Sequence, residues 1–170
     1  KEKFIGVGEI GIDLYWDKST QAIQEDAFLE QCQWAIDSKL PIVIHSREST
    51  TLLLDLLDAH FPTGIDGVFH CFGGTEGEAE RILNRNMYVG IGGVVTFKNT
   101  TLRDILQKVP LNSVVLETDS PYLAPMPFRG KRNESSYITN VIDKLVDIYG
   151  VSFEEIAKIT TQNSKDIFSI

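Results

Sequence analysis

The sequence is poor in features that mark several large classes of protein. No apolar run approaches the roughly 20 residues that a membrane-spanning helix needs, so we expect no contact with a membrane. Basic residues are outnumbered, 16 against 24 acidic ones, and the net charge of −8 argues against a wide basic surface that coats nucleic acid. Such a balance still allows an enzyme that holds one phosphate locally with the help of metal ions.

Cysteine is also scarce. The only two, Cys32 and Cys71, do not lie in a CxxC pair. The simplest interpretation is two reduced, mostly buried thiols in a reducing compartment, which predicts a cytoplasmic protein. Cys71 directly follows His70, and its alternative role is that of a metal ligand.

What the sequence does contain is a regular alternation of two patterns. Its 170 residues, 42% of them apolar, suffice for one domain with a core. Continuously apolar segments alternate with amphipathic ones, which predicts strands buried on both faces of a parallel sheet and an α/β fold. The expected strands are 4–12, 41–45, 67–72, 87–93 and 113–119. The expected helices are 20–40, 48–61, 75–86, 101–109 and two after residue 136. The first of these should bury Ile23, Ala27, Phe28, Cys32, Ala35 and Ile36.

Four of these strands end on or near a potential metal ligand: Glu9, His45, His70 and Asp119. In parallel α/β sheets, sites form at the carboxyl ends of the strands, so the four side chains should converge. A lone buried histidine is more often structural, but buried charges that recur in this way call for pairing or a metal. Imidazole and carboxylate suit one or two Zn, Mn or Mg ions, and Glu9 could bridge two. His60, at a helix end, is expected to be a surface or capping residue.

Further polar residues flank these four. Arg129, Lys131 and Arg132 follow Asp119 in an otherwise acidic chain, either as a solvated turn or as a clamp for a substrate phosphate. Two more positions are ambiguous. Arg47 could reach a phosphate or fix the carboxylate of Asp13, and Glu117 should lie behind the ligands on the same strand face as Asp119.

The motifs that carry these residues resemble the TatD family of metal-dependent deoxyribonucleases. The resemblance runs through "GVGEIGID", "PIVIHSRES", "GVFHCFGG", "YVGIGG", "LETDSPYLAPMPFRGKRNE" and "TTQNSKDIF", in order. It implies a TIM-type (β/α)8 barrel of the amidohydrolase kind that binds one or two divalent cations and hydrolyses phosphodiester bonds in DNA from an end of the strand. It also implies that Glu9 is a bridging ligand, that His45 and His70 are further ligands, and that Asp119 both binds metal and helps to deprotonate the attacking water.

The resemblance also bears on length. The family begins with a strand carrying His-x-His and two more strand–helix units, none of which this sequence contains. A complete barrel needs roughly 250 residues. We therefore expect residues 1–170 to be a single domain, the last five of eight strand–helix units, which needs the N-terminal segment or self-association to cover its edges and can be inactive alone.

Two other functions fit the same residues. One keeps the barrel and the metals but hydrolyses a cyclic amide, a lactone or another ester, and the basic segment 129–132 argues against it. The other is an inactive fragment that binds a partner through an open sheet edge.

Overall fold

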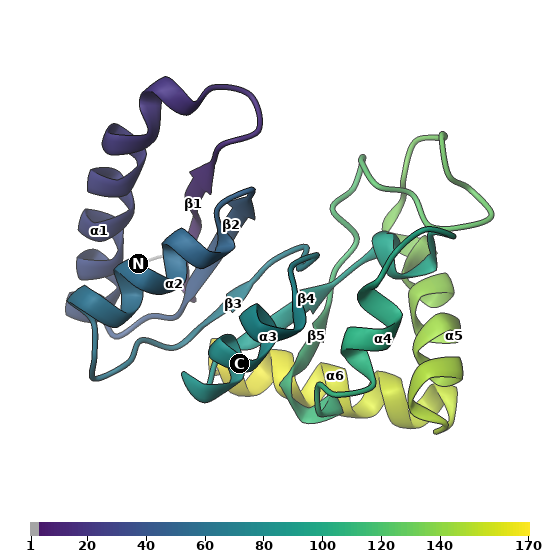
Figure 1. The fold of residues 1–170 in the computed structure, drawn as a ribbon. Helices are drawn as coiled ribbons and strands as arrows, with labels where there is room; N and C mark the ends of the chain where they lie inside the picture. Colours follow the sequence, from purple (N-terminus) through teal and green to yellow (C-terminus); the bar gives the residue numbers. More distant parts are fainter. Residues whose placement is uncertain (1–3) are drawn as a thin grey trace.

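The computed structural model describes residues 4–170 and contains one parallel sheet (Figure 1). Its strands lie side by side in the order in which they occur in the chain, and each neighbouring pair is parallel. They are β1 (Val7–Asp13), β2 (Ile42–Arg47), β3 (Gly67–Phe69), β4 (Tyr88–Ile91) and β5 (Val114–Leu116). The predicted α/β class and parallel sheet are confirmed. Within the described residues β1 and β5 each pair on one side only, so this sheet is open rather than a closed barrel.

At least one helix follows every strand. They are α1 (Gln21–Ser38), α2 (Thr50–His60), α3 (Glu76–Asn84), α4 (Leu102–Leu106), α5 (Ile138–Tyr149) and α6 (Phe153–Phe168). The sequence explains two of their starts: Thr75 and Glu78 form a capping box at α3, and the Ser152 side chain accepts the Glu155 N–H at α6. Among residues 4–170 no helix combines the length and apolarity required to cross a bilayer.

The core lies between the sheet and these helices, with Phe28, Ile44, Leu54 and Phe69 fully buried. The predicted apolar face of α1 is only partly right. Phe28, Cys32 and Ala35 are buried, but Ala27 is exposed, Ile23 is 71% exposed and Ile36 is 39% exposed. A helix turns about 100° per residue, so Ile23 points about 140° away from Phe28 and misses the stripe that packs on β1.

Three predicted strands end earlier than expected, and β4 stops at Ile91 because the chain turns into a short 3-10 helix at Gly93–Thr96. β3 stops at Phe69, although the His70 N–H still bonds the Ile44 carbonyl at 3.0 Å. β5 stops at Leu116, so Glu117 and Asp119 lie beyond the strand rather than on one strand face. Asp119 has a left-handed backbone (φ 52°), which turns the chain into the loop that leads to α5.

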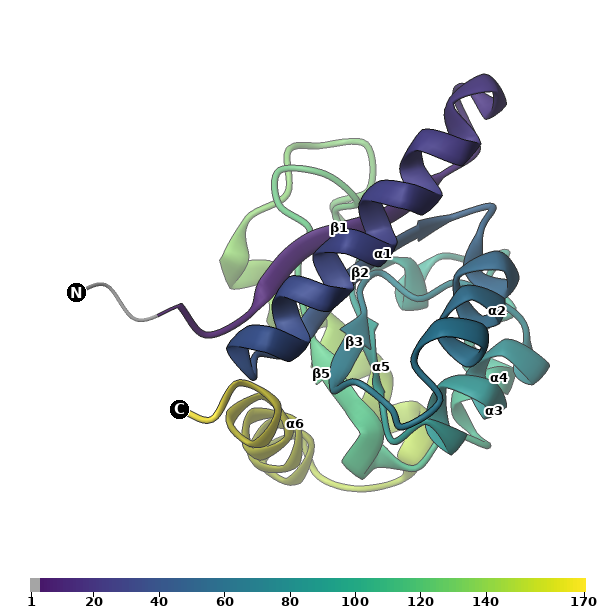
Figure 2. The ribbon, with the colours of Figure 1, turned by 90° about the vertical axis from the view of Figure 1, so that its left-hand side faces the viewer.

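The carboxyl ends of the strands all face one end of the molecule. Figures 1 and 2 show the loop after β5 at this end and α6 at the opposite one. The loop after β1 also lies at the carboxyl end of the sheet (Figure 1). The residues predicted to form the site therefore all lie toward the carboxyl end of the sheet.

Candidate metal centre

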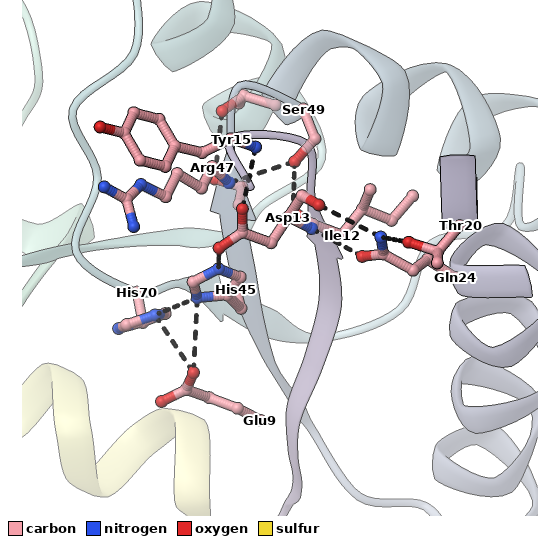
Figure 3. A network of polar contacts seen from close by, with 12 residues as sticks. Glu9, Ile12, Asp13, Tyr15, Thr20, Gln24, His45, Arg47, Ser49 and His70 are labelled. Atoms are coloured by element: carbon pink, nitrogen blue, oxygen red, sulfur yellow. Dashed lines mark hydrogen bonds and ion pairs between the residues drawn. The ribbon is translucent and has the colours of Figure 1, made fainter. Parts of the chain in front are cut away.

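Three of the four predicted ligands meet in a small triangle (Figure 3). Glu9 comes from β1, His45 from β2, and His70 directly follows β3. His45 Nδ1 lies 3.1 Å from His70 Nε2, and Glu9 Oε2 lies 3.3 Å from His70 Nε2 and 3.6 Å from His45 Nδ1. The pairing of β1 with β2 shifts register between Gly8 and Ile10, and such bulges re-aim a side chain, here that of Glu9.

The spacing of these atoms fits a bound cation. In tetrahedral Zn sites the metal–nitrogen bonds are about 2.0–2.1 Å, which places neighbouring ligand atoms about 3.3–3.4 Å apart. The three measured separations bracket that value. Two imidazole nitrogens and a carboxylate oxygen are also donors that Zn and Mn accept readily. The three residues therefore form a candidate site for a divalent cation.

A carboxylate stands behind His45. Asp13 Oδ2 lies 3.2 Å from His45 Nε2, the ring nitrogen that faces away from the triangle (Figure 3). The Tyr15 N–H donates to Asp13 Oδ1 at 2.9 Å, and the Gln24 amide from α1 bonds both the N–H and the carbonyl of Asp13. Burial works to raise the pKa of Asp13, but the Tyr15 hydrogen bond and His45 together hold it below its usual value. An ionised Asp13 fixes the orientation of the His45 ring.

A second carboxylate stands behind His70. Glu117 Oε1 is 3.5 Å from His70 Nδ1, and that oxygen has no shorter partner within the described chain. Burial works to lower the pKa of His70, yet Glu117, Glu9 and Asp119 raise it overall. Gly90 makes room for this carboxylate, since a Cβ there would lie 2.5 Å from Glu117 Oε2. Glu117 thus lies where it was expected, behind a ligand.

Asp119, the fourth predicted ligand, does not belong to the triangle. Burial raises the pKa of its carboxyl; His70 opposes this, and the nearby acids Glu117 and Glu9 add to it. Its loop is held by Asn133, whose buried side-chain amide donates to the carbonyls of Thr118 and Tyr122, both at 2.6 Å. Asp119 is therefore close enough for the charges of the site to shift its pKa, but its carboxylate does not join the cluster of three ligand atoms.

The predicted phosphate contacts are all exposed. Arg47 does not pair with Asp13: its guanidinium lies over the Tyr15 ring, 3.8 Å from the centroid. Arg129 lies 4.3 Å from the centroid of Phe97. Lys131 and Arg132 are exposed on the same loop as Arg129. None of these four basic residues takes part in an ion pair among residues 4–170.

Sequence reasoning missed two residues that organise the site. The Gln24 side chain hydrogen-bonds the backbone of Asp13 and so joins α1 to the end of β1. The Asn133 side chain hydrogen-bonds two backbone carbonyls within the loop after β5. The signals were weak ones: a glutamine on the buried side of a helix start, and an asparagine that ends a basic run. Asp13 was considered only as a partner of Arg47, although its place in "GEIGID" puts it next to His45.

The remaining candidates take no part. His60 is exposed at the last residue of α2, as expected. Cys32 and Cys71 are free thiols, and the three-ligand cluster does not include Cys71. Burial raises the pKa of Cys71 to about 12, so its sulfur stays protonated near neutral pH.

The chain is similar to known proteins in sequence. Residues 1–169 match the family described as TatD related DNase. A Bacillus subtilis protein named "Uncharacterized metal-dependent hydrolase YabD" is 40% identical over 99% of this chain and 67% of its own length. A Citrobacter rodentium protein named "3'-5' ssDNA/RNA exonuclease TatD" is 33% identical over 98% of this chain and 65% of its own length.

A solved structure agrees with the fold. The TatD homologue YJJV from Escherichia coli superposes with a TM-score of 0.90 at 31% identity, over 97% of this chain and 64% of that one. The chain thus spans about two thirds of the length of the relatives that it matches.

Proposed function

The chain belongs to the family of TatD related DNases, and from this premise we propose that its protein is a metal-dependent hydrolase that removes nucleotides from an end of a DNA strand. One observation carries the proposal. Glu9, His45 and His70 present three donor atoms at the spacing of a metal site, and carboxylates stand behind both histidines. The relative from Citrobacter rodentium, whose name describes an exonuclease on single-stranded DNA and RNA, supports the substrate class.

The residues divide the work as follows. A divalent cation, when bound, supplies Lewis acidity toward a phosphoryl oxygen and the attacking water. Glu9, His45 and His70 hold it, and Asp13 and Glu117 keep the two imidazole rings in place. Asp119 accepts the proton of the attacking water, a role that suits a carboxyl whose pKa burial has raised. Arg47, Arg129, Lys131 and Arg132 bind the phosphates of the strand.

The test is hydrolysis with defined metals. The whole protein, stripped with a chelator, should not cleave a single-stranded oligonucleotide, and Mn, Mg or Zn should restore cleavage. The same preparations are assayed on a lactone and on a cyclic amide. Metal-restored turnover of those compounds without cleavage of the oligonucleotide would contradict the nuclease proposal, and turnover of none would contradict a hydrolase.

We further propose that the edges of the sheet are covered in the functional protein. β1 and β5 each have one unpaired side in the described residues, and exposed edges of parallel sheets are prone to association. Further strands of the same protein or a second copy would provide the cover. The intact mass and the association state of the purified active protein decide between these. A monomeric 19.0 kDa chain with full activity would contradict both.

A further inference from the structure

Two aromatic side chains stand exposed at the rim of the candidate metal centre. Tyr15 and Trp16 lie in the loop between β1 and the short 3-10 helix at Lys18–Thr20, and their exposed fractions are 50% and 78%. Their rings meet edge to face, with centroids 4.7 Å apart. An indole that keeps most of its area in water offers a flat apolar face for a planar ligand.

A cation is attached to this pair. The Arg47 guanidinium lies 3.8 Å from the centroid of Tyr15 and 5.5 Å from that of Trp16. Within residues 4–170 it makes no ion pair with a carboxylate, so its N–H donors can bind an anion. The loop therefore presents a flat apolar surface and an anion-binding group side by side, which is the chemistry of a nucleotide: a base with a phosphate next to it.

The pair is also joined to the metal centre. The Tyr15 N–H donates to Asp13 Oδ1 at 2.9 Å, and Asp13 Oδ2 contacts His45 Nε2 at 3.2 Å (Figure 3). Two short polar contacts thus connect the aromatic loop to a ligand of the triangle. A phosphodiester held at the triangle would place a flanking nucleotide within reach of this loop.

We propose that Trp16, supported by Tyr15 and Arg47, stacks against an unpaired nucleobase next to the scissile phosphate. This inference rests on the proposed function and narrows it to single strands and frayed ends. Inside a duplex each base is stacked on its neighbours and paired, so presenting a face to Trp16 requires unstacking. A terminal unpaired base has a free face.

The chain contains a matched control. Trp34, its other tryptophan, is 52% exposed and lies in the last third of α1. α1 starts next to the carboxyl end of β1 and runs back along it, so Trp34 lies toward the opposite end of the sheet (Figure 1). It is also more than half exposed, and in the described residues no arginine lies over its ring.

The first experiment compares two substrates in the whole protein. One is a single-stranded oligonucleotide, and the other carries an abasic residue at the nucleotide flanking the cleaved bond. Trp16→Ala should lower kcat/KM about 5- to 150-fold on the first, the range of base stacking on an aromatic residue, and less than about twofold on the second. Trp34→Ala should change neither. Equal losses of Trp16→Ala on both substrates, or no loss, would overturn the proposal.

The second experiment does not depend on turnover. Chelator-treated Trp34→Phe protein, whose remaining tryptophan in residues 1–170 is Trp16, is titrated with oligothymidylate, and its fluorescence should be quenched. Trp16→Phe protein should show no quenching. Absence of quenching in Trp34→Phe overturns the stacking site. Quenching without metal-restored cleavage would leave the stacking site standing and contradict only the proposed hydrolysis.

Discussion

Two regions of the molecule contribute to the same site in different ways: the first three strands, β1 to β3, and the segment that follows β5. Glu9, His45 and His70 are placed by strands, and both histidines are braced by carboxylates. Asp119 and the basic residues 129–132 lie on a loop that one buried side chain, Asn133, holds together. The first region keeps three ligand atoms within a few ångströms of one another, and the second leaves its basic residues in solvent but half-buries Asp119. We interpret the first as the metal centre, the basic residues of the second as a surface that binds the substrate, and Asp119 as the link between the two.

The largest expected effect breaks the first region. In the whole protein, Glu9→Ala or His70→Ala should remove the bound cation and lower the rate of hydrolysis by more than about 100-fold, beyond the range seen when an outer residue is lost. His60→Ala, at the exposed end of α2, is the control and should keep both. Metal content by elemental analysis and turnover are measured together. Near-normal metal content in both site variants would refute the assignment.

A smaller effect is expected one contact farther out. Asp13→Asn keeps the side-chain size but removes the charge behind His45, and it should weaken metal affinity about 10- to 100-fold. Asp26→Asn, an exposed acid on α1, serves as the control. Competition with a chromophoric chelator measures the affinity. Identical affinities of the two variants would show that Asp13 does not orient the ligand.

The second region should respond to salt rather than to metal. Arg129→Ala or Lys131→Ala should weaken oligonucleotide binding and reduce the slope of log K against log salt by about one each, while metal affinity stays unchanged. Lys158→Ala, exposed on α6 at the far end of the sheet, should leave the slope unaltered. Binding isotherms at several ionic strengths test this. An unchanged slope in both loop variants would make the segment a solvated turn.

The smallest effect lies away from both regions. Asp58 on α2 accepts hydrogen bonds from Arg81 and Arg85, at 2.6 Å each. The Arg81 bond lowers the pKa of Asp58 below 3.8; burial opposes this, and Arg85 adds to it. A carboxyl whose pKa is lower in the folded chain than in the unfolded one stabilises the fold at a pH above the unfolded pKa. This stability is lost as the pH falls through the folded pKa. Asp58→Asn should therefore reduce the free energy of unfolding slightly near neutral pH and less in acid, with turnover unchanged. Denaturant titrations of the wild type and the variant near neutral pH and in acid measure the loss. A loss of stability that is larger in acid than near neutral pH would contradict this sign.

The contrast between residues placed by strands and residues placed by a loop also explains which parts of the site the sequence could predict. Glu9, His45 and His70 were foreseeable because hydrophobic segments locate parallel strands, and parallel strands bring their ends together. Asp119 was predicted to lie on a strand and does not: β5 ends at Leu116 and Asp119 itself has a left-handed backbone, which no pattern of apolar residues encodes. Gln24 and Asn133 act through side-chain bonds to distant backbone groups, which depend on the folded arrangement rather than on periodicity.

The central claim is that two imidazoles and one carboxylate share a cation. X-ray absorption at the metal edge of the Zn-loaded whole protein tests it directly, with His70→Ala and His60→Ala measured alongside. We predict scattering from two imidazoles at about 2.0–2.1 Å, which stays the same in His60→Ala and is lost together with the bound zinc in His70→Ala. A spectrum without imidazole, or one that His70→Ala leaves unchanged, would contradict the account.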